Sequence, residues 1–522
     1  MIRILLCLIS ALLLTLSFPT FDLGFLAWIA LIPQLLAIRN ISLKSAFALS
    51  WISGTAFFMG ALSWINSVKG VTLLHSSIMG VYLGLYFVIF GVFLNMIHKR
   101  SRFPFVVTAP ALWVTAEYLR SQAGAFGFPF ALLGHTQHHN LPLIQLASFT
   151  GAYGVSFVVV MANAAIADLL VYLLSPSPPS LSRQGRGRFV FNPLHRGGFV
   201  LAIILVLWIV GWQVIPRNLS GKPFSVAVVQ GNIPPDVKWK REHRDQILSK
   251  YENLSEGVAR LRPRLIVWPE ASTPGFALKD LSLYSQLSQM VRRFNTYVVL
   301  GSAEYPKFSK TKVKFGKTGN TALLFSPEGK VISQYLKIRL LPFGEYVPYE
   351  GVIPWPKFIV APSTNSHIAG TEAVLFGIEG AKFGILICSE MMYPDLSRAM
   401  VKKGAVFLLN LSNEGWFGKG SFPYQFLSLC IFRAVENRVN VVRCTNTGIS
   451  GFIDPYGRIT AKVTNEGQDI FVEGALTQDI FLSPPGTFYT HHGDILAYGC
   501  IAFSIGLVVW SMVKKRFIGG AK

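Results

Sequence analysis

The sequence predicts a bundle of membrane-spanning helices joined to one large α/β domain. Hydrophobic residues make up 51% of the 522 residues and charged residues only 14%, and the mean hydropathy is +0.44. Such values exclude a purely soluble protein and are typical of a chain with several membrane spans. Long apolar stretches occur up to about residue 215, and another follows residue 494. Between them lie short runs rich in β-branched residues, which indicate buried strands.

Eight apolar stretches are candidate membrane spans. Each is close to the roughly 20 residues that a helix needs to cross a bilayer, although the first two are short. The stretches are residues 1–16, 21–38, 46–65, 76–97, 103–119, 154–174, 198–215 and 495–513. We expect the first to be retained, because no small-residue cleavage site follows it and the second apolar run begins almost at once.

The basic residues in the short connections predict the orientation of these spans. If the N-terminus is cytoplasmic, the inner side carries Arg39, Lys44, Lys99, Arg100, Arg102, Arg183, Arg186, Arg188, Arg196, Lys514, Lys515, Arg516 and Lys522. The short outer connections hold little beyond Lys69 and Arg120. Because basic loops stay in the cytoplasm, we expect both termini inside and the segment from about 216 to 494 outside. This topology accounts for most basic clusters without a nucleic-acid partner, despite the net charge of +22.

Two connections have unusual compositions. Residues 175–198 are rich in Pro, Ser, Gly and Arg and are expected to form a solvated cytoplasmic linker. The connection 120–150 is fairly apolar and carries His135, His138 and His139. A metal site from these histidines is the less favoured interpretation, because no carboxylate flanks them. We expect a re-entrant or interfacial segment that lines a lipid-accessible cavity.

The outer segment has the pattern of a layered α/β domain. Strands are expected at 225–230, 265–268, 297–300, 321–325, 383–387, 406–409 and 439–443, and amphipathic helices at 244–261, 281–294 and 424–436. The strands are almost continuously apolar, which indicates a sheet buried on both faces. The five cysteines of the chain are scattered and have no zinc-site spacing, so neither a disulfide framework nor a zinc finger is expected.

Ionisable residues follow three of these expected strands and runs. Glu270 comes just after residues 265–268, Lys337 ends the run 331–336, and Cys388 ends the strand 383–387. Each taken singly also fits a plain structural role. Together they form a sufficient set for acyl transfer, because a nucleophilic thiol needs a nearby base and an ammonium can stabilise the oxyanion. The carboxyl ends of strands are where α/β folds place reactive groups.

The motifs around these residues carry a family resemblance. Trp268-Pro-Glu270, the lysine before Leu-Pro-Phe-Gly-Glu345, and Ile-Cys388-x-Glu390 resemble the Glu-Lys-Cys triad of the nitrilase superfamily. More narrowly, the chain resembles the apolipoprotein N-acyltransferases of the bacterial inner membrane nearly end to end. The further motifs are Phe25-Leu-Ala-Trp-Ile-Ala-Leu-Ile-Pro33, Gly127-Phe-Pro-Phe130, Val229-Gln-Gly-Asn-Ile-Pro234, Leu411-Ser-Asn-Glu-Gly-Trp-Phe-Gly418 and Thr445-Asn-Thr-Gly-Ile-Ser450.

This resemblance implies a fold and a set of site residues. The fold is a membrane helical bundle of about eight spans with a periplasmic nitrilase-like αββα sandwich. The implied domains are residues 1–215, 216–494 and 495–522, the last being a membrane helix with a basic cytoplasmic tail. The implied catalytic residues are Cys388 as nucleophile, Glu270 as general base, Lys337 as oxyanion stabiliser and Glu345 as a second essential carboxylate. The implied substrate-binding residues are Trp239, Ser389, Glu390 and Trp416.

The implied activity is a phospholipid:apolipoprotein N-acyl transfer without metal or organic cofactor. The sn-1 acyl chain of a phospholipid, phosphatidylethanolamine in the family, passes through a cysteine thioester to the amine of a lipoprotein's diacylglyceryl-cysteine. A monomer in the inner membrane is expected. Two positions depart from the family pattern, which has an aromatic residue at Ser389 and an arginine at His491.

Three other functions fit parts of the sequence. A membrane-tethered amidase would use the same triad on a small polar substrate. A transporter with a non-catalytic outer domain is less favoured, because transporters usually place ionisable residues along a path. Here Glu117 and Asp168 are the only acidic residues inside the spans from the third onward. A catalytically inactive scaffold is also less favoured, because all three triad residue types are present.

Overall fold

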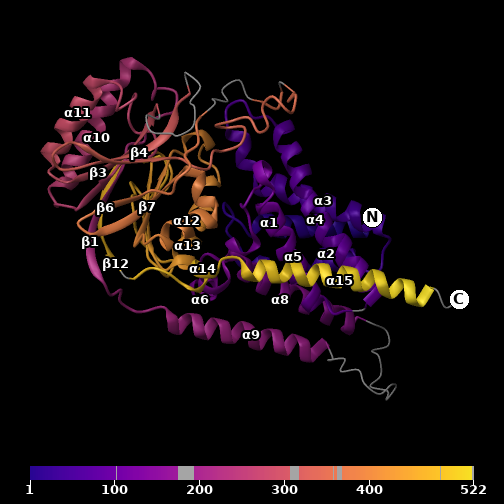
Figure 1. Cartoon of the computed structure of the whole chain (residues 1–522). Helices are drawn as coiled ribbons and strands as arrows, with labels where there is room; N and C mark the ends of the chain where they lie inside the picture. Colours follow the sequence, from indigo (N-terminus) through magenta and orange to yellow (C-terminus); the bar gives the residue numbers. More distant parts are fainter. Residues whose placement is uncertain are drawn as a thin grey trace. The chain divides into compact units, whose positions relative to one another are not determined.

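A computed structural model describes residues 1–101, 103–174, 193–305, 317–356, 358–360, 367–482 and 484–519. Within this part, the chain divides into two compact units (Figure 1). The helical unit contains Met1–Asn66, Thr72–Ile215 and Asp494–Lys522, and the α/β unit contains Ser67–Val71 and Pro216–Gly493. Most of the expected linker 175–198, with Arg183, Arg186 and Arg188, lies outside the described residues, as do Arg102 and Lys522.

The helical unit contains long helices at most of the expected spans. They are α1 (Ile2–Leu16), α3 (Leu43–Ala61), α4 (Leu73–Ser101), α5 (Phe105–Ser121), α8 (Ala152–Leu173), α9 (Pro193–Val214) and α15 (Ile495–Gly519). Among the described helices, four are long and apolar enough to cross a membrane, namely 73–100, 152–173, 193–214 and 495–513. The fold class is therefore confirmed at the level of apolar helices beside an α/β unit, and the count of eight spans stays a prediction.

The expected second span, residues 21–38, is not one continuous helix. It consists of the 3-10 helix η1 (Gly24–Trp28) and the short helix α2 (Ile32–Ala37), whose first turn contains Pro33. The break leaves backbone groups that a continuous helix would pair internally. Asn163 of α8 satisfies two of them, because its side chain accepts from the Leu31 N–H at 2.8 Å and donates to the Ala27 carbonyl at 2.9 Å.

The connection after α5 is built from short helical turns held by two buried charges. These turns are η3 (Gly124–Phe126), η4 (Leu133–Gln137), α6 (Leu141–Ile144) and α7 (Ala147–Thr150). The Arg120 guanidinium donates to the carbonyls of Phe128, Phe130 and Ala131, and Glu117 accepts from the Leu133 N–H at 2.7 Å. Non-helical backbone inside an apolar unit needs such partners, because a buried unpaired amide or carbonyl is costly.

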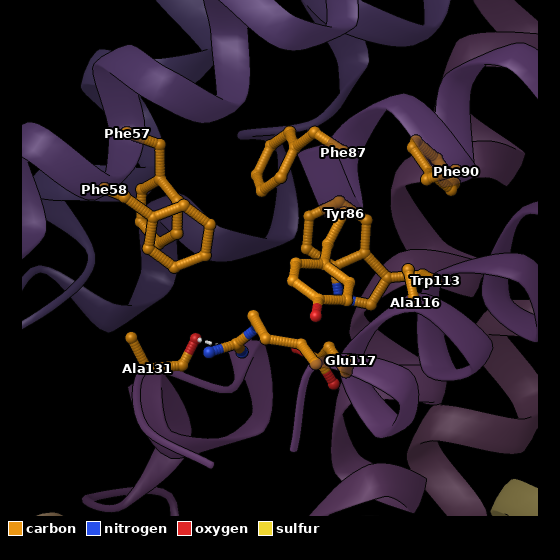
Figure 2. Close-up of a pocket in the computed structure, with 10 residues that line it drawn as sticks. Phe57, Phe58, Tyr86, Phe87, Phe90, Trp113, Ala116, Glu117 and Ala131 are labelled. Atoms are coloured by element: carbon orange, nitrogen blue, oxygen red, sulfur yellow. Dashed lines mark hydrogen bonds between the residues drawn. The ribbon is translucent and has the colours of Figure 1, made fainter. Parts of the chain in front are cut away.

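Aromatic side chains surround these two charges. Figure 2 shows a pocket lined by Phe57, Phe58, Tyr86, Phe87, Phe90, Trp113, Ala116, Glu117 and Ala131, and Arg120 also lines it. The Arg120 guanidinium lies 5.2 Å from the centre of the Phe58 ring, a spacing typical of a cation–π contact. The other acidic residue of the spans, Asp168, lies 3.5 Å from Arg39 and 3.8 Å from Arg196. Both acids therefore have basic or backbone partners within the helical unit.

The α/β unit contains two stacked sheets. Within the described residues, each has six strands, in the orders β12-β1-β2-β3-β4-β5 and β11-β10-β9-β8-β7-β6. The first sheet comprises β1 (Lys222–Gln230), β2 (Leu265–Val267), β3 (Tyr297–Glu304), β4 (Gly319–Phe325), β5 (Val331–Leu336) and β12 (Gly474–Leu482). The second comprises β6 (Leu375–Ile378), β7 (Ala381–Ile387), β8 (Phe407–Ser412), β9 (Asn440–Thr445), β10 (Gly451–Ile453) and β11 (Ile459–Lys462).

Helices cover the outer faces of both sheets, as Figure 1 shows. Helices α10 (Arg244–Ala259) and α11 (Leu281–Phe294) pack on the first sheet, where the Tyr251 and Trp268 rings stack at 4.7 Å. Helices α12 (Pro394–Lys402) and α13 (Phe422–Asn437) pack on the second. The inner faces meet at Phe224 and Phe407, whose rings lie 5.5 Å apart. The described layers are thus helix, sheet, sheet, helix, and the expected layered α/β domain is confirmed.

The strand directions bring several strand ends to one edge of each sheet. Strands β1, β2 and β3 are parallel, and β5 runs in their direction because it is antiparallel to β4, which is antiparallel to β3. Strands β7, β8 and β9 are parallel in the second sheet. Consequently the segments that follow β2 and β5 leave the same edge, as do those that follow β7 and β8. Functional groups of α/β proteins gather at such edges.

Candidate active site

Cys388 directly follows β7 and begins the 3-10 helix η6 (Cys388–Met392). Its φ is +49°, which is the left-handed region that residues with a side chain rarely adopt. Such conformations persist only where the surrounding structure enforces them, and they cluster at functional sites. The residue is partly buried, and a side-chain hydrogen bond links its thiol to Ser412, the last residue of β8. The turn after β7 therefore holds the Cys388 thiol in one defined position.

Glu270 lies beyond the end of β2 and accepts three hydrogen bonds. Its Oε1 accepts from the Asn320 side chain at 2.6 Å, and its Oε2 accepts from the Asn413 backbone N–H at 2.7 Å. The Glu270 backbone carbonyl accepts from Lys238 Nζ at 3.2 Å. Lys238 is 2% exposed, and burial lowers its pKa to about 8 although Glu270 acts in the opposite direction. Both carboxylate oxygens of Glu270 are thus fixed by donors.

Lys337 follows β5 and forms a buried ion pair with Glu345. Its Nζ lies 2.8 Å from the Glu345 carboxylate, and the lysine is 1% exposed. Lys337 Nζ contacts both oxygens of that carboxylate, and Oε2 also accepts from the Leu341 backbone N–H at 2.7 Å. Glu345 therefore connects the lysine to the loop that follows it, and this loop carries the Leu-Pro-Phe-Gly motif.

The charges of these groups act on one another, which indicates that they share one site. Burial raises the pKa of the Cys388 thiol, the Glu270 and Glu345 carboxylates raise it further, and the Lys337 ammonium lowers it only in part. Burial also raises the pKa of Glu270, against the effect of Lys337. Burial would lower the pKa of Lys337, but Glu345, Cys388 and Glu270 raise it above its ordinary value. The resting thiol is therefore protonated, while the lysine beside it is charged.

Glu390 lies at the same turn but is completely buried. Its Oε1 accepts from the Tyr335 hydroxyl at 2.8 Å and from the backbone N–H groups of Ile338 at 2.6 Å and Arg339 at 3.1 Å. Its Oε2 accepts from the Ile387 N–H at 2.8 Å. Burial raises the pKa of Glu390 to about 7, although the backbone donors oppose this shift. The side chain thus links the residues that follow Lys337 to the residue that precedes Cys388.

The remaining expected site residues differ in exposure. Ser389 is buried, and its hydroxyl has no hydrogen-bond partner among the described residues. Trp239 is 51% exposed and Trp416 is 46% exposed. Their loops adjoin, because a Cβ added at Gly415 would lie 2.8 Å from Pro235. The structure therefore brings Glu270, Lys337, Glu345 and Cys388 together, with Glu390 and Ser389 packed beside them and the two tryptophans on the surface.

Three residues that support Glu270 were not predicted from the sequence. Asn413 lies within the motif Leu411-Ser-Asn-Glu, and Lys238 precedes the expected site residue Trp239, but neither was expected to have a role. Asn320, in β4, lies in none of the sequence motifs that indicated the site. A base, a charged lysine and a thiol in this arrangement can attack an ester or amide carbonyl and pass the acyl group to water or to an amine.

Comparisons with known proteins decide the family. Residues 10–165 match the family model of the apolipoprotein N-acyltransferase N-terminal domain, and residues 225–477 match that of the carbon-nitrogen hydrolases. An apolipoprotein N-acyltransferase of Geobacter metallireducens is 34% identical over 507 residues, which cover 95% of this chain and 93% of that protein. The chain belongs to the apolipoprotein N-acyltransferase family. The family resemblance drawn from the sequence motifs is confirmed, and the chain is an acyltransferase with a nitrilase-like domain.

Other similar proteins include a second relative matched over nearly its whole length and a solved structure. The apolipoprotein N-acyltransferase of Chlorobaculum tepidum is 30% identical over 541 residues, which cover 98% of this chain and 96% of that protein. A solved nitrilase-superfamily protein of Saccharomyces cerevisiae is 21% identical and has a TM-score of 0.37, covering 51% of this chain and 93% of its own. The assignment of the chain to the family rests on the relatives that match it over nearly the whole length of both chains.

Proposed function

We propose that this enzyme moves the sn-1 acyl chain of a phospholipid, phosphatidylethanolamine, through a thioester on Cys388 to the amine of a lipoprotein's diacylglyceryl-cysteine. The observation that carries the proposal is the set of a partly buried thiol at Cys388 with a buried carboxylate at Glu270 and a buried ammonium at Lys337, whose charges perturb the pKa values of one another. Family membership supports the choice of acyl donor and acceptor.

The first half-reaction forms the thioester. Because the resting thiol is protonated, Glu270 accepts its proton as the sulfur attacks the ester carbonyl. The Lys337 ammonium stabilises the oxyanion of the tetrahedral intermediate. The ester C–O bond then breaks, Glu270 returns the proton to the leaving oxygen, and lysophospholipid departs. Burial raises the pKa of Glu270, which makes it a stronger base than an exposed glutamate.

The second half-reaction transfers the acyl chain to the lipoprotein. The amine of the diacylglyceryl-cysteine attacks the thioester carbonyl, and Glu270 removes its proton. Lys337 again stabilises the oxyanion. The C–S bond breaks, Cys388 regains a proton, and the N-acylated lipoprotein leaves with three acyl chains. Each half-reaction forms one bond and breaks one, and every proton that Glu270 takes up is returned, so the proposed cycle uses no metal or organic cofactor.

The surrounding residues have supporting roles in this proposal. Glu345 keeps Lys337 charged and aimed, as their 2.8 Å ion pair suggests. Trp239 and Trp416, both about half exposed, offer apolar surface to acyl chains, and Ser389 lies beside the nucleophile. Glu390 was expected to bind substrate, but its lack of exposed surface supports a positioning role instead.

We further propose the membrane arrangement that the charge pattern predicts. The chain lies in the bacterial inner membrane as a monomer with eight spans, residues 1–215 forming seven of them and residues 495–522 the last span and tail. Residues 216–494 form the periplasmic catalytic domain. Both substrates carry acyl chains, and each methylene kept out of water contributes about 0.8 kcal/mol. The internal partners of Glu117 and Asp168 give no support to a transport path.

A mass spectrum of the intact enzyme tests the proposed function. After incubation with phosphatidylethanolamine of one defined acyl composition, we expect a mass increase equal to the sn-1 acyl group, located on Cys388 by peptide mapping. Addition of a diacylglyceryl-cysteine peptide should remove this mass and yield a triacylated peptide. The alternative, a membrane-tethered amidase, predicts turnover of small amides and no acyl group passed to the peptide, and that outcome would overturn the transferase assignment.

Replacing Glu390 by glutamine tests the positioning role. We expect a fall of about 10- to 100-fold in kcat, because several donors converge on this carboxylate and a glutamine amide presents N–H groups to some of them. The KM for phospholipid should stay unchanged, since the side chain has no exposed surface. Initial rates over a range of phospholipid concentrations separate the two parameters.

A graded control accompanies this test. Tyr335→Phe removes one of the donors to Glu390, the hydroxyl at 2.8 Å, and should lower kcat much less than Glu390→Gln. A raised KM with an unchanged kcat in Glu390→Gln would instead assign the residue to substrate binding.

A further inference from the structure

Asp22, His138 and His139 form a cluster in the helical unit. Asp22 lies in the turn between α1 and η1, and the two histidines lie between η4 and α6. One candidate ligand atom from each of the three residues lies within 4.8 Å of the other two. No carboxylate flanks the histidines in the sequence, but the fold supplies one from a distant part of the chain.

Each histidine faces a different oxygen of the same carboxylate. His139 Nε2–H donates to Asp22 Oδ2 at 2.8 Å, and His138 Nε2 lies 3.7 Å from Asp22 Oδ1. A metal ion bound by His139 takes the place of this proton, as ligands lose a proton on metal binding. The two imidazole rings lie 4.0 Å apart between centroids. Two imidazoles and one carboxylate are a common donor set for zinc in proteins.

The hydrogen bonding of His138 leaves a ligand atom facing Asp22. The His138 Nδ1–H donates to the His135 carbonyl at 3.1 Å, so Nε2 carries the lone pair in a neutral ring. A backbone carbonyl that holds the second ring nitrogen is the usual support of a metal-binding histidine.

Asp22 Oδ1, which faces this nitrogen, is buried and has no hydrogen-bond donor among the described residues. A lone pair of nitrogen and a carboxylate oxygen therefore face each other across 3.7 Å, and both are electron-rich. The gap is too long for a hydrogen bond. It suits a cation, because a zinc ion lies about 2.0–2.2 Å from each nitrogen or oxygen ligand.

The backbone around the cluster is held in place from both sides. The Gln137 side chain donates to the Gly24 carbonyl at 2.8 Å and accepts from Trp28 Nε1 at 2.9 Å. A Cβ at Gly24 would lie 2.2 Å from the Thr136 carbonyl oxygen, so only glycine allows this approach. Asp22 itself has a φ of +58°. The turn after α1 and the residues before α6 are thus fixed close together, as metal sites require.

We propose that Asp22, His138 and His139 bind one divalent transition-metal ion, with zinc as the best fit. Imidazole and carboxylate ligands suit zinc and its neighbours in the first transition row, whereas magnesium and calcium prefer oxygen ligands alone. His139 is 69% exposed, which provides an entry path and leaves the remaining coordination position to water. The bound ion ties the turn after α1 to the segment before α6.

Zinc binding to the full-length protein in detergent tests this site. The protein carries an affinity tag without histidines, and zinc affinity is measured by competition with a chromophoric chelator. We expect one tightly bound zinc per chain, unaffected by excess magnesium. Asp22→Asn and His139→Ala should each lower the affinity at least about 10- to 100-fold, the loss typical for a group that supports a metal site.

Controls separate a specific site from adsorption and from misfolding. His195→Ala removes another exposed histidine of the helical unit and should leave the affinity unchanged. Acyl-enzyme formation at Cys388 and the unfolding temperature of the metal-free protein report whether each variant folds. Equal zinc affinity in the wild type and in folded Asp22→Asn and His139→Ala would overturn the proposal, and so would an equal loss in His195→Ala. Neither outcome bears on the acyl-transfer assignment.

Discussion

Substitution of Cys388 by serine is expected to abolish the covalent acyl-enzyme and to lower acyl transfer by at least about 10⁴-fold, in the range seen when a nucleophile is removed. A serine hydroxyl has a much higher pKa than a thiol, so the Glu270 carboxylate cannot deprotonate it effectively. The measurement is the label that the denatured enzyme retains after incubation with phospholipid carrying a labelled sn-1 chain.

Cys444→Ser is the matched control for this substitution. Cys444 is a buried cysteine of the same unit, and its Sγ lies 3.4 Å from the Val229 carbonyl oxygen and 3.1 Å from that of Val267. A serine hydroxyl can donate to the same carbonyls, so labelling should persist. Full labelling of Cys388→Ser, or loss of label in a folded Cys444→Ser, would contradict the assignment of the nucleophile.

Replacement of Lys337 by methionine is expected to slow thioester formation about 100- to 1000-fold, the typical cost of removing one oxyanion donor. Methionine has a similar length but no charge. The same change leaves the Glu345 carboxylate without its cation, and loss of one partner of a buried ion pair typically costs about 3–5 kcal/mol of stability. Single-turnover labelling measures the rate, and thermal unfolding measures the stability.

A double variant separates these two effects. Lys337→Met with Glu345→Gln removes the unpaired charge and should recover most of the stability, while the rate stays low. Recovery of the rate in the double variant would mean that Lys337 acts only by balancing Glu345. A wild-type rate in Lys337→Met would mean that another group stabilises the oxyanion.

The groups at the centre of the site could be predicted because the hydrophobic pattern of the sequence shows where the strands end. Glu270, Lys337 and Cys388 each follow an apolar run. The first sheet brings the ends of β2 and β5 to one edge, and β7 ends at an edge of the second sheet. Their partners depend instead on the pairing of specific atoms. The Asn413 N–H that binds Glu270 belongs to the backbone, which carries no residue-type signal.

Burial and long-range contacts account for the expectations that failed or changed. Glu390 has the residue type expected at the site, but the sequence could not tell that backbone donors enclose it. The second expected span is interrupted, and Asn163, from another helix, satisfies the backbone N–H of Leu31 and the carbonyl of Ala27 at the break. The contact of Asp22 with His138 and His139 could not be predicted, because Asp22 lies more than a hundred residues before them in the chain.

The Cys388 thiol is protonated at rest, and this state affects its susceptibility to oxidation. Peroxides and disulfides react with the thiolate form of cysteine, so susceptibility to oxidation follows thiolate character. Burial and two carboxylates raise the pKa of Cys388, so little thiolate is present before a substrate arrives. In the periplasmic position that we propose for this domain, where no reducing pool protects thiols, the protonated form would protect Cys388 from oxidation between turnovers.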